Sequence, residues 1–579
     1  MEPARTGPKN AAELAFKYRD VVRRLPPKRY VDLLLRNFFT DVAWFYDVVD
    51  RQIFEEKLAA WDRVSYSTLS QDPLSLPPDV RLFPALLFQM LAQALLFQPV
   101  CSDNTLNDLK YAPQMSFSDL AAEHSDAGEA ILDILGNRDA TTVRVQAGLL
   151  RACFQKSTGC VIEAWHTLGC TIRDAQEIGL HCLGPPDDWT LAAPGTEPPS
   201  KRFREAEQRR KIWLVLHLWD GHMAVVLGRP MSTRLDPATF AASWHELDRA
   251  TSTASAAPLQ PTGHYPHAFD VILCGYDAAY RYLQDIHDLE YTSLRGESGA
   301  MVRNLHAAIT SNIRHLPDWV RAENPNTEYD GLPTCFWLPA ARETLKTEIY
   351  FVLLALHRPY IFSEPASRHE ALEAALQILT SQSRLFSQTP PRQYMAFNLV
   401  FATFDAMVLI ASIYILYPHE NAHQLDASLR GIEWGLARLD AMRKLNRMAG
   451  AAYQTVHSLY GKLKHRLAAM PRAHDLISLN VSLDEGSLAA GLEHAQTCLA
   501  PARPGPSELE LALNLDSVLP PQPLHDLVFQ NIPSSDMRAA SGLLSTQEPA
   551  AASGQPPPNS GHPDLLPDDF WRMMNGLDG

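Results

Sequence analysis

Apolar residues that recur every three to four positions are the feature that most limits what this chain can fold into. The segment that begins at Ile212 shows the pattern clearly, with its apolar positions at Ile212, Val215, Leu216, Trp219, Met223 and Val226. This spacing places the six side chains on one face of an α-helix. No segment alternates apolar and polar residues convincingly enough to favour a strand. The sequence therefore predicts an all-α fold.

Two further segments predict a helical hairpin. Apolar residues recur with helical spacing over 143–154 and 161–178, and Ser157, Thr158 and Gly159 lie between them. Two helices joined by a short polar turn pack side by side as an antiparallel pair.

Asp220 lies beside the apolar stripe of the first segment, next to Trp219. A carboxylate near a core needs a partner, because unpaired burial is costly. Arg229 is the nearest plausible cation, which favours an ion pair that stabilises the fold. A ligand-binding or catalytic role for Asp220 is the alternative.

Residues 397–417 are almost wholly apolar, which is compatible with either a membrane span or a buried core helix. Asp405 lies near the middle, and a central aspartate costs about 2.5–3.5 kcal/mol on insertion into a bilayer. No Lys or Arg cluster flanks the segment to orient it. We therefore expect a buried core helix and no membrane partner.

Changes in composition along the chain predict three regions. Residues 1–27 read as a short flexible N-terminus, and 28–470 as one large, compact helical body. Residues 471–579 read as a largely disordered tail, because the stretch from 501 to 561 is rich in Pro, Ser, Ala and Gly and has little apolar surface to bury. Pro/Gly/Ser-rich loops divide the helical body at 70–78, 184–200, 252–266 and 324–333.

Charge and cysteine content restrict the partners and the compartment. The chain has 66 acidic and 51 basic residues and a net charge of −15, with no concentrated basic module. Such a chain repels phosphate backbones, so DNA binding by this chain alone is disfavoured. The eight cysteines lie mostly in apolar helical patterns, which is typical of reduced thiols in a cytosolic or nuclear protein. The first residues contain no apolar stretch of signal-peptide length, so we do not expect secretion.

A zinc-protease pattern, H-E-x-x-H, occurs from His419 to His423. In such enzymes the two histidines share one helical face and bind the metal. Pro418 directly precedes the first histidine, which indicates a loop–helix junction, and the extended pattern is missing. We interpret the match as coincidental.

Two basic clusters, 201–202 and 209–211, suggest a two-part nuclear import signal. The spacer between them is short, and the second cluster opens the helix that begins near Ile212. We therefore favour a structural role for this cluster.

Several motifs occur in an order that resembles a known family. They are Gly179-Leu180-His181, the run from Glu207 to Lys211, Ile212-Trp213, Asp220, and Leu227-Gly228-Arg229-Pro230, with an aromatic segment over 30–61 before them and Leu356-His357-Arg358-Pro359-Tyr360 after them. Together they resemble the middle homology region of fungal zinc-cluster transcription factors, over about 28–470.

The resemblance implies a helical regulatory domain that controls activation, oligomerises and in some members senses small molecules. It implies no catalytic residue, so we expect no enzyme and assign no catalytic, cofactor-binding, metal-binding or DNA-binding residue. Gly228 and Pro230 are expected to end a helix, and His357 and Arg358 to anchor a helix end.

The chain departs from the family in its cysteines. The usual factor begins with six zinc-binding cysteines spaced C-x2-C-x6-C twice. Here the first cysteine is Cys101, and no C-x2-C pair occurs. Cys153 and Cys160 have the gap of one half-element but bracket the predicted hairpin. Three readings follow: action through a DNA-bound partner, a truncated gene product, or loss of DNA binding.

The tail contains a candidate activation segment at 564–574, where acidic residues alternate with Leu, Phe, Trp and Met. Such segments fold as short amphipathic helices on a coactivator. A tail that docks back on the body, or is inert, is the alternative.

These observations predict a nuclear regulator of a specialised gene set, such as secondary metabolism or nutrient use. Its expected partners are a coactivator or DNA-bound factor, and the chain itself as a homodimer or a related chain as a heterodimer. The alternative is a small-molecule-binding or scaffold protein without promoter activity.

Overall fold

A computed structural model describes residues 8–98, 104–136, 139–182, 201–235, 266–292 and 298–469. Within these ranges the chain forms seventeen α-helices, with short 3-10 and π segments and no strand. The predicted all-α class is confirmed. The predictions for residues 471–579, including the activation segment at 564–574, and for the loop at 184–200 concern residues outside the described ranges.

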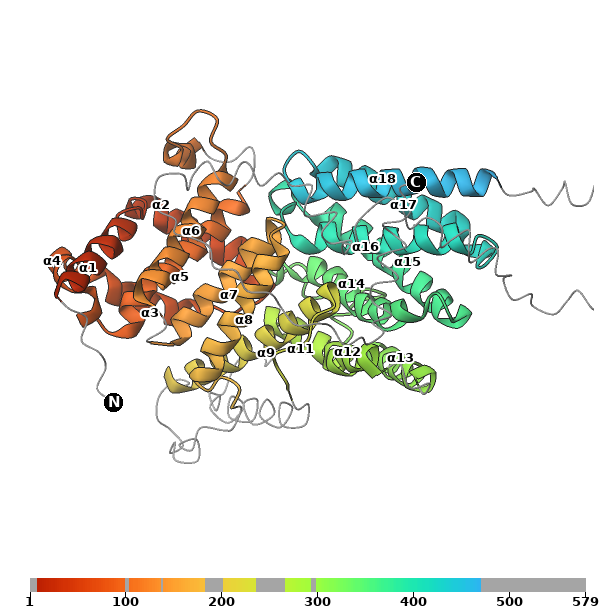
Figure 1. Ribbon diagram of the computed structural model, residues 1–579, viewed down its shortest axis with the longest axis horizontal. Helices are drawn as coiled ribbons and strands as arrows, with labels where there is room; N and C mark the ends of the chain where they lie inside the picture. The colour runs from red at the N-terminus through yellow and green to blue at the C-terminus, as the bar shows by residue number, and fades with distance from the viewer. Residues whose placement is uncertain are drawn as a thin grey trace, which may run out of the picture.

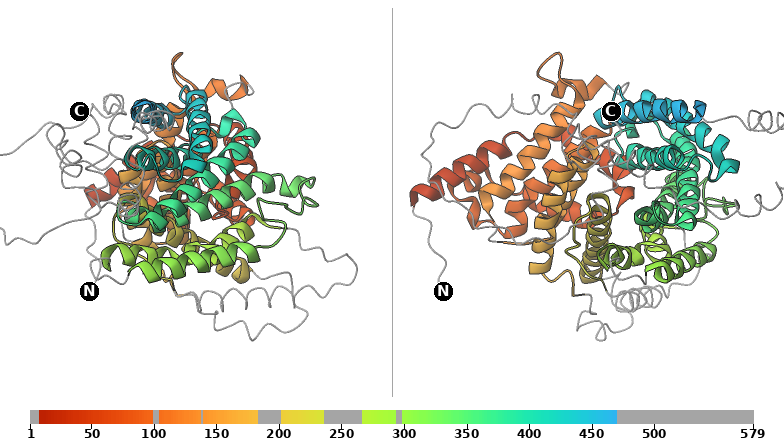
Figure 2. Two further views of the ribbon diagram at one scale, coloured as in Figure 1. Left: turned by 90° about the vertical axis from the view of Figure 1, so that its right-hand side faces the viewer. Right: turned by 45° about the vertical axis from the view of Figure 1, so that its right-hand side comes forward.

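The helices form two groups that lie side by side along the long axis of the molecule (Figure 1, Figure 2). The first group contains α1 (Pro8–Val22), α2 (Lys28–Asn37), α3 (Arg51–Asp62), α4 (Tyr66–Gln71), α5 (Pro78–Leu96), α6 (Phe117–Leu135), α7 (Thr142–Ser157) and α8 (Val161–Glu177). The second contains α13 (Ser298–His315), α14 (Leu338–His357), α15 (Pro365–Gln388), α16 (Phe397–Leu416), α17 (Leu425–Met442) and α18 (Arg447–Ala468). Between them lie α9 (Lys201–Leu227) and α11 (Ala268–Ala278), while α12 (Leu283–Thr292) lies below α14 and packs against α9 and α14 (Figure 1).

Each group is built around one helix that is apolar on all sides. Helix α5 packs against α6 and α7, and α16 packs against α15, α17 and α18. Both helices are long and apolar enough to cross a bilayer, yet 89% and 83% of their most apolar windows are buried inside the fold. The prediction of a buried core helix over 397–417 is confirmed. Asp405 is buried in α16, where Arg358 pairs with it.

Side-chain caps fix several helix starts. The carboxylate of Asp50 accepts a hydrogen bond of 2.8 Å from the backbone N–H of Ile53 at the start of α3. Ser116 and Asp119 form a reciprocal capping box at the start of α6. Each pairing satisfies backbone donors that have no partner within their own helix.

The predicted hairpin is formed by α7 and α8, which pack against each other. Gly159 turns the chain with a φ of 90°, a conformation that glycine adopts without strain. Gly148 in α7 allows a close approach, because a Cβ there would lie 2.3 Å from Oγ1 of Thr171 in α8.

The expectation of a flexible N-terminus over residues 1–27 is wrong for 8–22, which form α1. Tyr18 is fully buried, and its hydroxyl donates a hydrogen bond of 2.7 Å to the carbonyl of Arg81. Ala15, Tyr18 and Val21 recur at a spacing of three and lie buried on one face of α1. This short stripe docks α1 on α4 and α6, so the helical body begins before residue 28.

Candidate functional site

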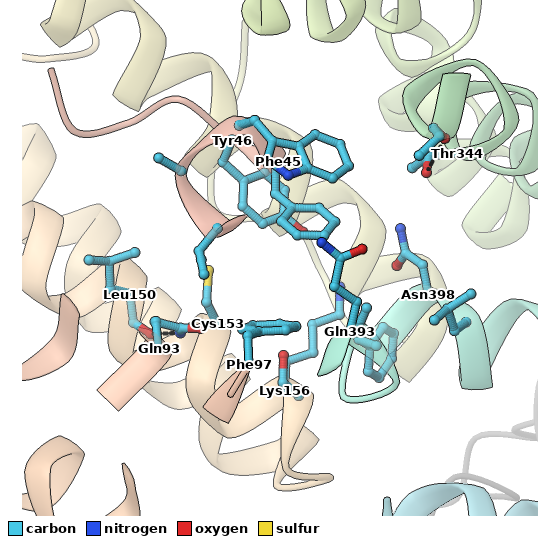
Figure 3. A pocket seen from close by; sticks show the side chains of 18 of the residues that line it. Phe45, Tyr46, Gln93, Phe97, Leu150, Cys153, Lys156, Thr344, Gln393 and Asn398 are labelled. Carbon is cyan, nitrogen blue, oxygen red and sulfur yellow. Dashed lines mark hydrogen bonds between the residues drawn. The ribbon is translucent and has the colours of Figure 1, made fainter. Parts of the chain in front are cut away.

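A cavity lies where the two groups of helices meet. It consists of two adjoining pockets of about 90 and 100 Å³. The pockets share a wall made of Trp44, Phe45, Tyr46, Lys156, Trp219, Thr344 and Asn398. Part of this wall is shown in Figure 3.

The wall combines elements that are far apart in the sequence. Trp44 and Phe45 lie in a 3-10 turn (Ala43–Phe45), Lys156 on α7 and Trp219 on α9, all from the N-terminal part of the chain. The opposite side comes from α14 and α16, through Thr344 and Asn398 among others (Figure 3). A molecule in the cavity would therefore touch both groups of helices at once.

The turn that carries the aromatic side chains is fixed by Asp47. This residue has a φ of 49°, in the left-handed region, and its N–H bonds to the carbonyl of Ala43 at 2.8 Å. Its carboxylate accepts a hydrogen bond of 2.7 Å from Nζ of Lys211 on α9. The contact ties the turn to the helix that supplies Trp219.

Lys156 places a cation in this aromatic wall. Its side chain is 4% exposed, and Nζ lies 4.4 Å from the ring centroids of Trp219 and Phe397. Nζ also contacts Nδ1 of His222 at 3.5 Å. Burial lowers the pKa of Lys156 to about 8, although Glu348, and to a lesser extent Cys153, oppose the shift. The cation–π contacts favour the ammonium form.

Glu348 on α14 lines the second pocket with both oxygens occupied. The hydroxyl of Tyr280 donates to one oxygen, and Nδ2 of Asn398 donates to the other at 2.6 Å. Burial raises the pKa of Glu348, while the Tyr280 hydrogen bond and the Lys156 charge act in the opposite direction.

His222 is stacked on Phe351, with ring centroids 4.9 Å apart. Burial, and then the charge of Lys156, hold the pKa of His222 well below its usual value. The imidazole is therefore neutral near pH 7 and can accept a hydrogen bond from the ammonium.

An apolar, largely aromatic cavity with a few placed polar groups is the usual form of a small-molecule site. The first pocket is lined by one charged residue, Lys156, together with the amides of Gln93, Gln393 and Asn398. The arrangement can bind and orient a small ligand.

The predicted ion pair between Asp220 and Arg229 is wrong. Asp220 is buried, and its Oδ2 accepts hydrogen bonds of 2.7 Å from the N–H groups of Ser232 and Thr233 and of 2.8 Å from Oγ1 of Thr233. Arg229 instead lies over the ring of Trp165, 4.3 Å from its centroid. Asp220 therefore has a structural role that does not depend on a cation. Its carboxylate holds the turn after α9 through the N–H groups of Ser232 and Thr233 and the hydroxyl of Thr233.

His357 and Arg358 lie where α14 ends, as expected from their motif. His357 contacts Oγ of Ser367 at 3.2 Å and Nδ1 of His306 at 2.9 Å. Arg358 pairs with Asp405. Both side chains join α14 to neighbouring helices.

The H-E-x-x-H segment forms a turn followed by a 3-10 helix (Ala422–Gln424), and Asn421 adopts a φ of 52°. Glu420 receives two hydrogen bonds, of 2.7 and 2.8 Å, from the guanidinium of Arg368. The segment therefore does not place its histidines on one α-helical face, and its glutamate serves an ion pair.

The second basic cluster is part of the core, as predicted. Arg210 is 5% exposed, and Arg209 donates a hydrogen bond of 2.9 Å to the carbonyl of Ile178. Lys211 pairs with Asp47 and Glu207 at 2.7 and 3.1 Å. These contacts give the cluster a structural role at the start of α9. The side chains at 201–202 lie outside the described residues.

Comparison with known proteins identifies one region of the chain. Residues 35–239 match the family model described as "fungal specific transcription factor domain". Over 160 residues the chain is 26% identical to the "probable transcription factor sol4" of Alternaria solani. That alignment spans 28% of this chain and 27% of the relative, so the chain covers about a quarter of the relative's length. The match agrees with the predicted resemblance over 35–239, which include the motifs from Gly179 to Pro230, and does not extend to the motif at 356–360.

Proposed function

We propose that the protein, whose residues 35–239 match the model of the fungal specific transcription factor domain, is a nuclear transcription regulator whose output is set by a small molecule in the central cavity. The observation that carries the proposal is the composition of the cavity wall. The matched region supplies Trp44, Lys156 and Trp219, and the helices beyond it supply Thr344 and Asn398.

A ligand held between two groups of helices is suited to regulation. It changes an equilibrium between arrangements by as much as its affinity differs between them. Contacts with α7 and α9 on one side and α14 and α16 on the other make the affinity depend on how the groups sit together. Ligand binding would therefore change the arrangement of the two groups of helices, and a partner protein could respond to that change.

The net charge of −15 supports action through a DNA-bound partner, because a phosphate backbone repels an acidic chain. We propose a coactivator as the second partner and a specialised gene set as the target. A protein that binds the ligand without acting on promoters is the second candidate, and the same cavity favours it.

The full chain, fused to a foreign DNA-binding domain and a fluorescent tag, tests the proposal in a fungal host. We expect nuclear fluorescence and activation or repression of a reporter that carries the foreign binding site. Thr344→Leu, which fills both pockets, should change the reporter output severalfold. The matched control is Thr380→Leu, at an exposed position on α15.

Three outcomes separate the candidates. Reporter output that responds to Thr344→Leu and not to Thr380→Leu supports a cavity-controlled regulator. Reporter output that is the same for the wild type and both variants overturns control through the cavity. No reporter output, with fluorescence outside the nucleus, overturns the transcription role and favours the second candidate.

A further inference from the structure

We propose that the ligand of the central cavity is a small organic acid, a carboxylate joined to a flat apolar body, and that the ammonium group of Lys156 binds the carboxylate. The inference rests on the proposed function in one respect, that the cavity takes a ligand. It adds the chemical class of that ligand and the residue that recognises it.

The first argument is that the hydrogen bonding of Lys156 is incomplete. An ammonium group has three donors. In the described part of the chain it makes one hydrogen bond, to His222 at 3.5 Å, which is at the long limit for such a contact. No carboxylate in these ranges lies within 4.0 Å of Nζ. Burial of a cation without a close anion is energetically costly. A ligand carboxylate would supply both the anion and the hydrogen-bond acceptor that Lys156 lacks.

The second argument excludes a cationic ligand. Glu348 is the acid that lines the cavity, and both of its oxygens already accept hydrogen bonds, from Tyr280 and Asn398. A ligand ammonium would compete with these donors and would face the charge of Lys156. A neutral ligand would leave the buried ammonium without an anion within 4.0 Å. The charges in the cavity therefore favour an anion.

The third argument concerns the body of the ligand. Apart from Lys156, the walls of the first pocket are neutral, with aromatic rings on several sides: Trp44, Phe45, Phe97, Trp219 and Phe397. Flat rings pack against such walls in stacked or edge-on arrangements. An engineered apolar cavity of about 150 Å³ accepts benzene. Two adjoining pockets of about 90 and 100 Å³ thus suit a body of one or two rings.

Paired probes test the inference on the purified full chain by isothermal titration calorimetry at pH 7. The acids are benzoate, trans-cinnamate and indole-3-acetate, and each is compared with its amide. Benzylamine tests the opposite charge. We expect at least one acid to bind tenfold or more tightly than its amide, and benzylamine to bind more weakly than benzoate.

The variant Lys156→Met should remove the preference for the acid and leave the affinity for the amide within a factor of two or three. The matched control Lys444→Met, at an exposed position, should behave as the wild type. Because methionine removes a buried charge, the variant should melt at the same or a higher temperature. If it nevertheless fails to fold, the acid–amide comparison on the wild type decides.

The outcomes distinguish this inference from the proposed function. An amide that binds as tightly as its acid, or tightest binding by benzylamine, overturns the acid class and leaves a ligand-binding cavity. An acid preference that survives Lys156→Met overturns the role of Lys156. Binding of none of the probes overturns the inference, while the reporter experiment still judges the regulator independently.

Discussion

In the wall of the central cavity, Nζ of Lys156 on α7 lies 3.5 Å from Nδ1 of His222 on α9. Both residues are buried, and burial lowers the pKa of each. The imidazole is neutral near pH 7, so the contact joins a cation to a neutral acceptor. The positive charge of Lys156 therefore lies between α7 and α9, and neither helix, in its described residues, places an anion beside it.

The first prediction concerns how the Lys156 charge affects stability. Burial lowers its pKa to about 8 from the usual lysine value of 10.5, so the unfolded chain binds more protons between these two pH values. The free energy of unfolding therefore rises with pH across this window, by about 3 kcal/mol from this residue. The destabilisation is fully present below pH 8 and is relieved above pH 10.5.

Urea unfolding of the wild type and of Lys156→Met at pH 7, 8, 9 and 10 measures this contribution. The difference between the two proteins isolates Lys156 from other titrating groups. We expect the variant to be the more stable protein at pH 7 and the difference to shrink toward pH 10. A difference that stays constant with pH would show that the lysine is not held as a buried cation.

The second prediction separates the two candidate partners of Asp220. Asp220→Ala should lower the free energy of unfolding by about 2–3 kcal/mol, because three donors at Ser232 and Thr233, of which the two at Thr233 are buried, lose a charged acceptor. Arg229→Ala removes a contact over Trp165 and should cost about 1 kcal/mol. Chemical denaturation of both variants is the measurement. If both variants lost the same free energy of unfolding, the result would support an ion pair between Asp220 and Arg229 and contradict the hydrogen bonds described here.

The Asp220 case shows what local patterns can and cannot predict. Helical periodicity is local, so the sequence predicted α7, α8, α9 and α16. It also indicated that a carboxylate beside a buried stripe needs a partner. The partner itself depends on how the turn at Ser232 and Thr233 folds back onto α9. The nearest cation in the sequence was therefore the wrong choice.

The cavity could not be predicted, because it is the space left between helices that are distant in sequence. Lys156 lies in the last turn of α7, where a basic residue is ordinary since it faces the helix dipole. Glu348 carried a weak signal, because it lies three residues after Leu345 and four before Val352 on a face that is buried. A search for charged residues on the apolar face of a predicted helix would have identified Glu348.

The third prediction concerns the ion pair between Arg358 and Asp405. Burial raises the pKa of Asp405, while the Arg358 charge and hydrogen bond lower it. Asp405→Ala leaves a guanidinium that is 13% exposed without its partner and should cost about 3 kcal/mol. The double variant Arg358→Met with Asp405→Leu removes both charges and should recover most of that loss. Thermal and urea unfolding measure both, and a double variant as unstable as the single one would contradict the explanation.

The fourth prediction tests the close packing of α7 on α8. Gly148→Ala places a Cβ 2.3 Å from Oγ1 of Thr171, so we expect a loss of about 1–3 kcal/mol from overpacking. Gly169→Ala on α8 is the matched control, because its nearest neighbour is the end of Arg173 at 3.7 Å. That change should stabilise the chain by a few tenths of a kcal/mol up to about 1. Thr171→Ala should partly rescue Gly148→Ala, and the absence of any rescue would locate the strain elsewhere.

The last prediction concerns the pH dependence of acid binding in the cavity. The carboxylate needs the charged form of Lys156, whose pKa burial lowers to about 8. Below pH 8, down to the range where the probe itself becomes protonated, the affinity for benzoate should be constant. Above pH 8 it should fall by up to about tenfold per pH unit, because binding must first protonate the lysine.

Calorimetry at pH 7 and 9, in two buffers of different ionisation enthalpy, should detect proton uptake at pH 9 and little at pH 7. Benzamide has no charge to match, so its affinity should stay level. An acid affinity that is equally level through pH 9.5 would mean that the carboxylate is held by groups other than the Lys156 ammonium.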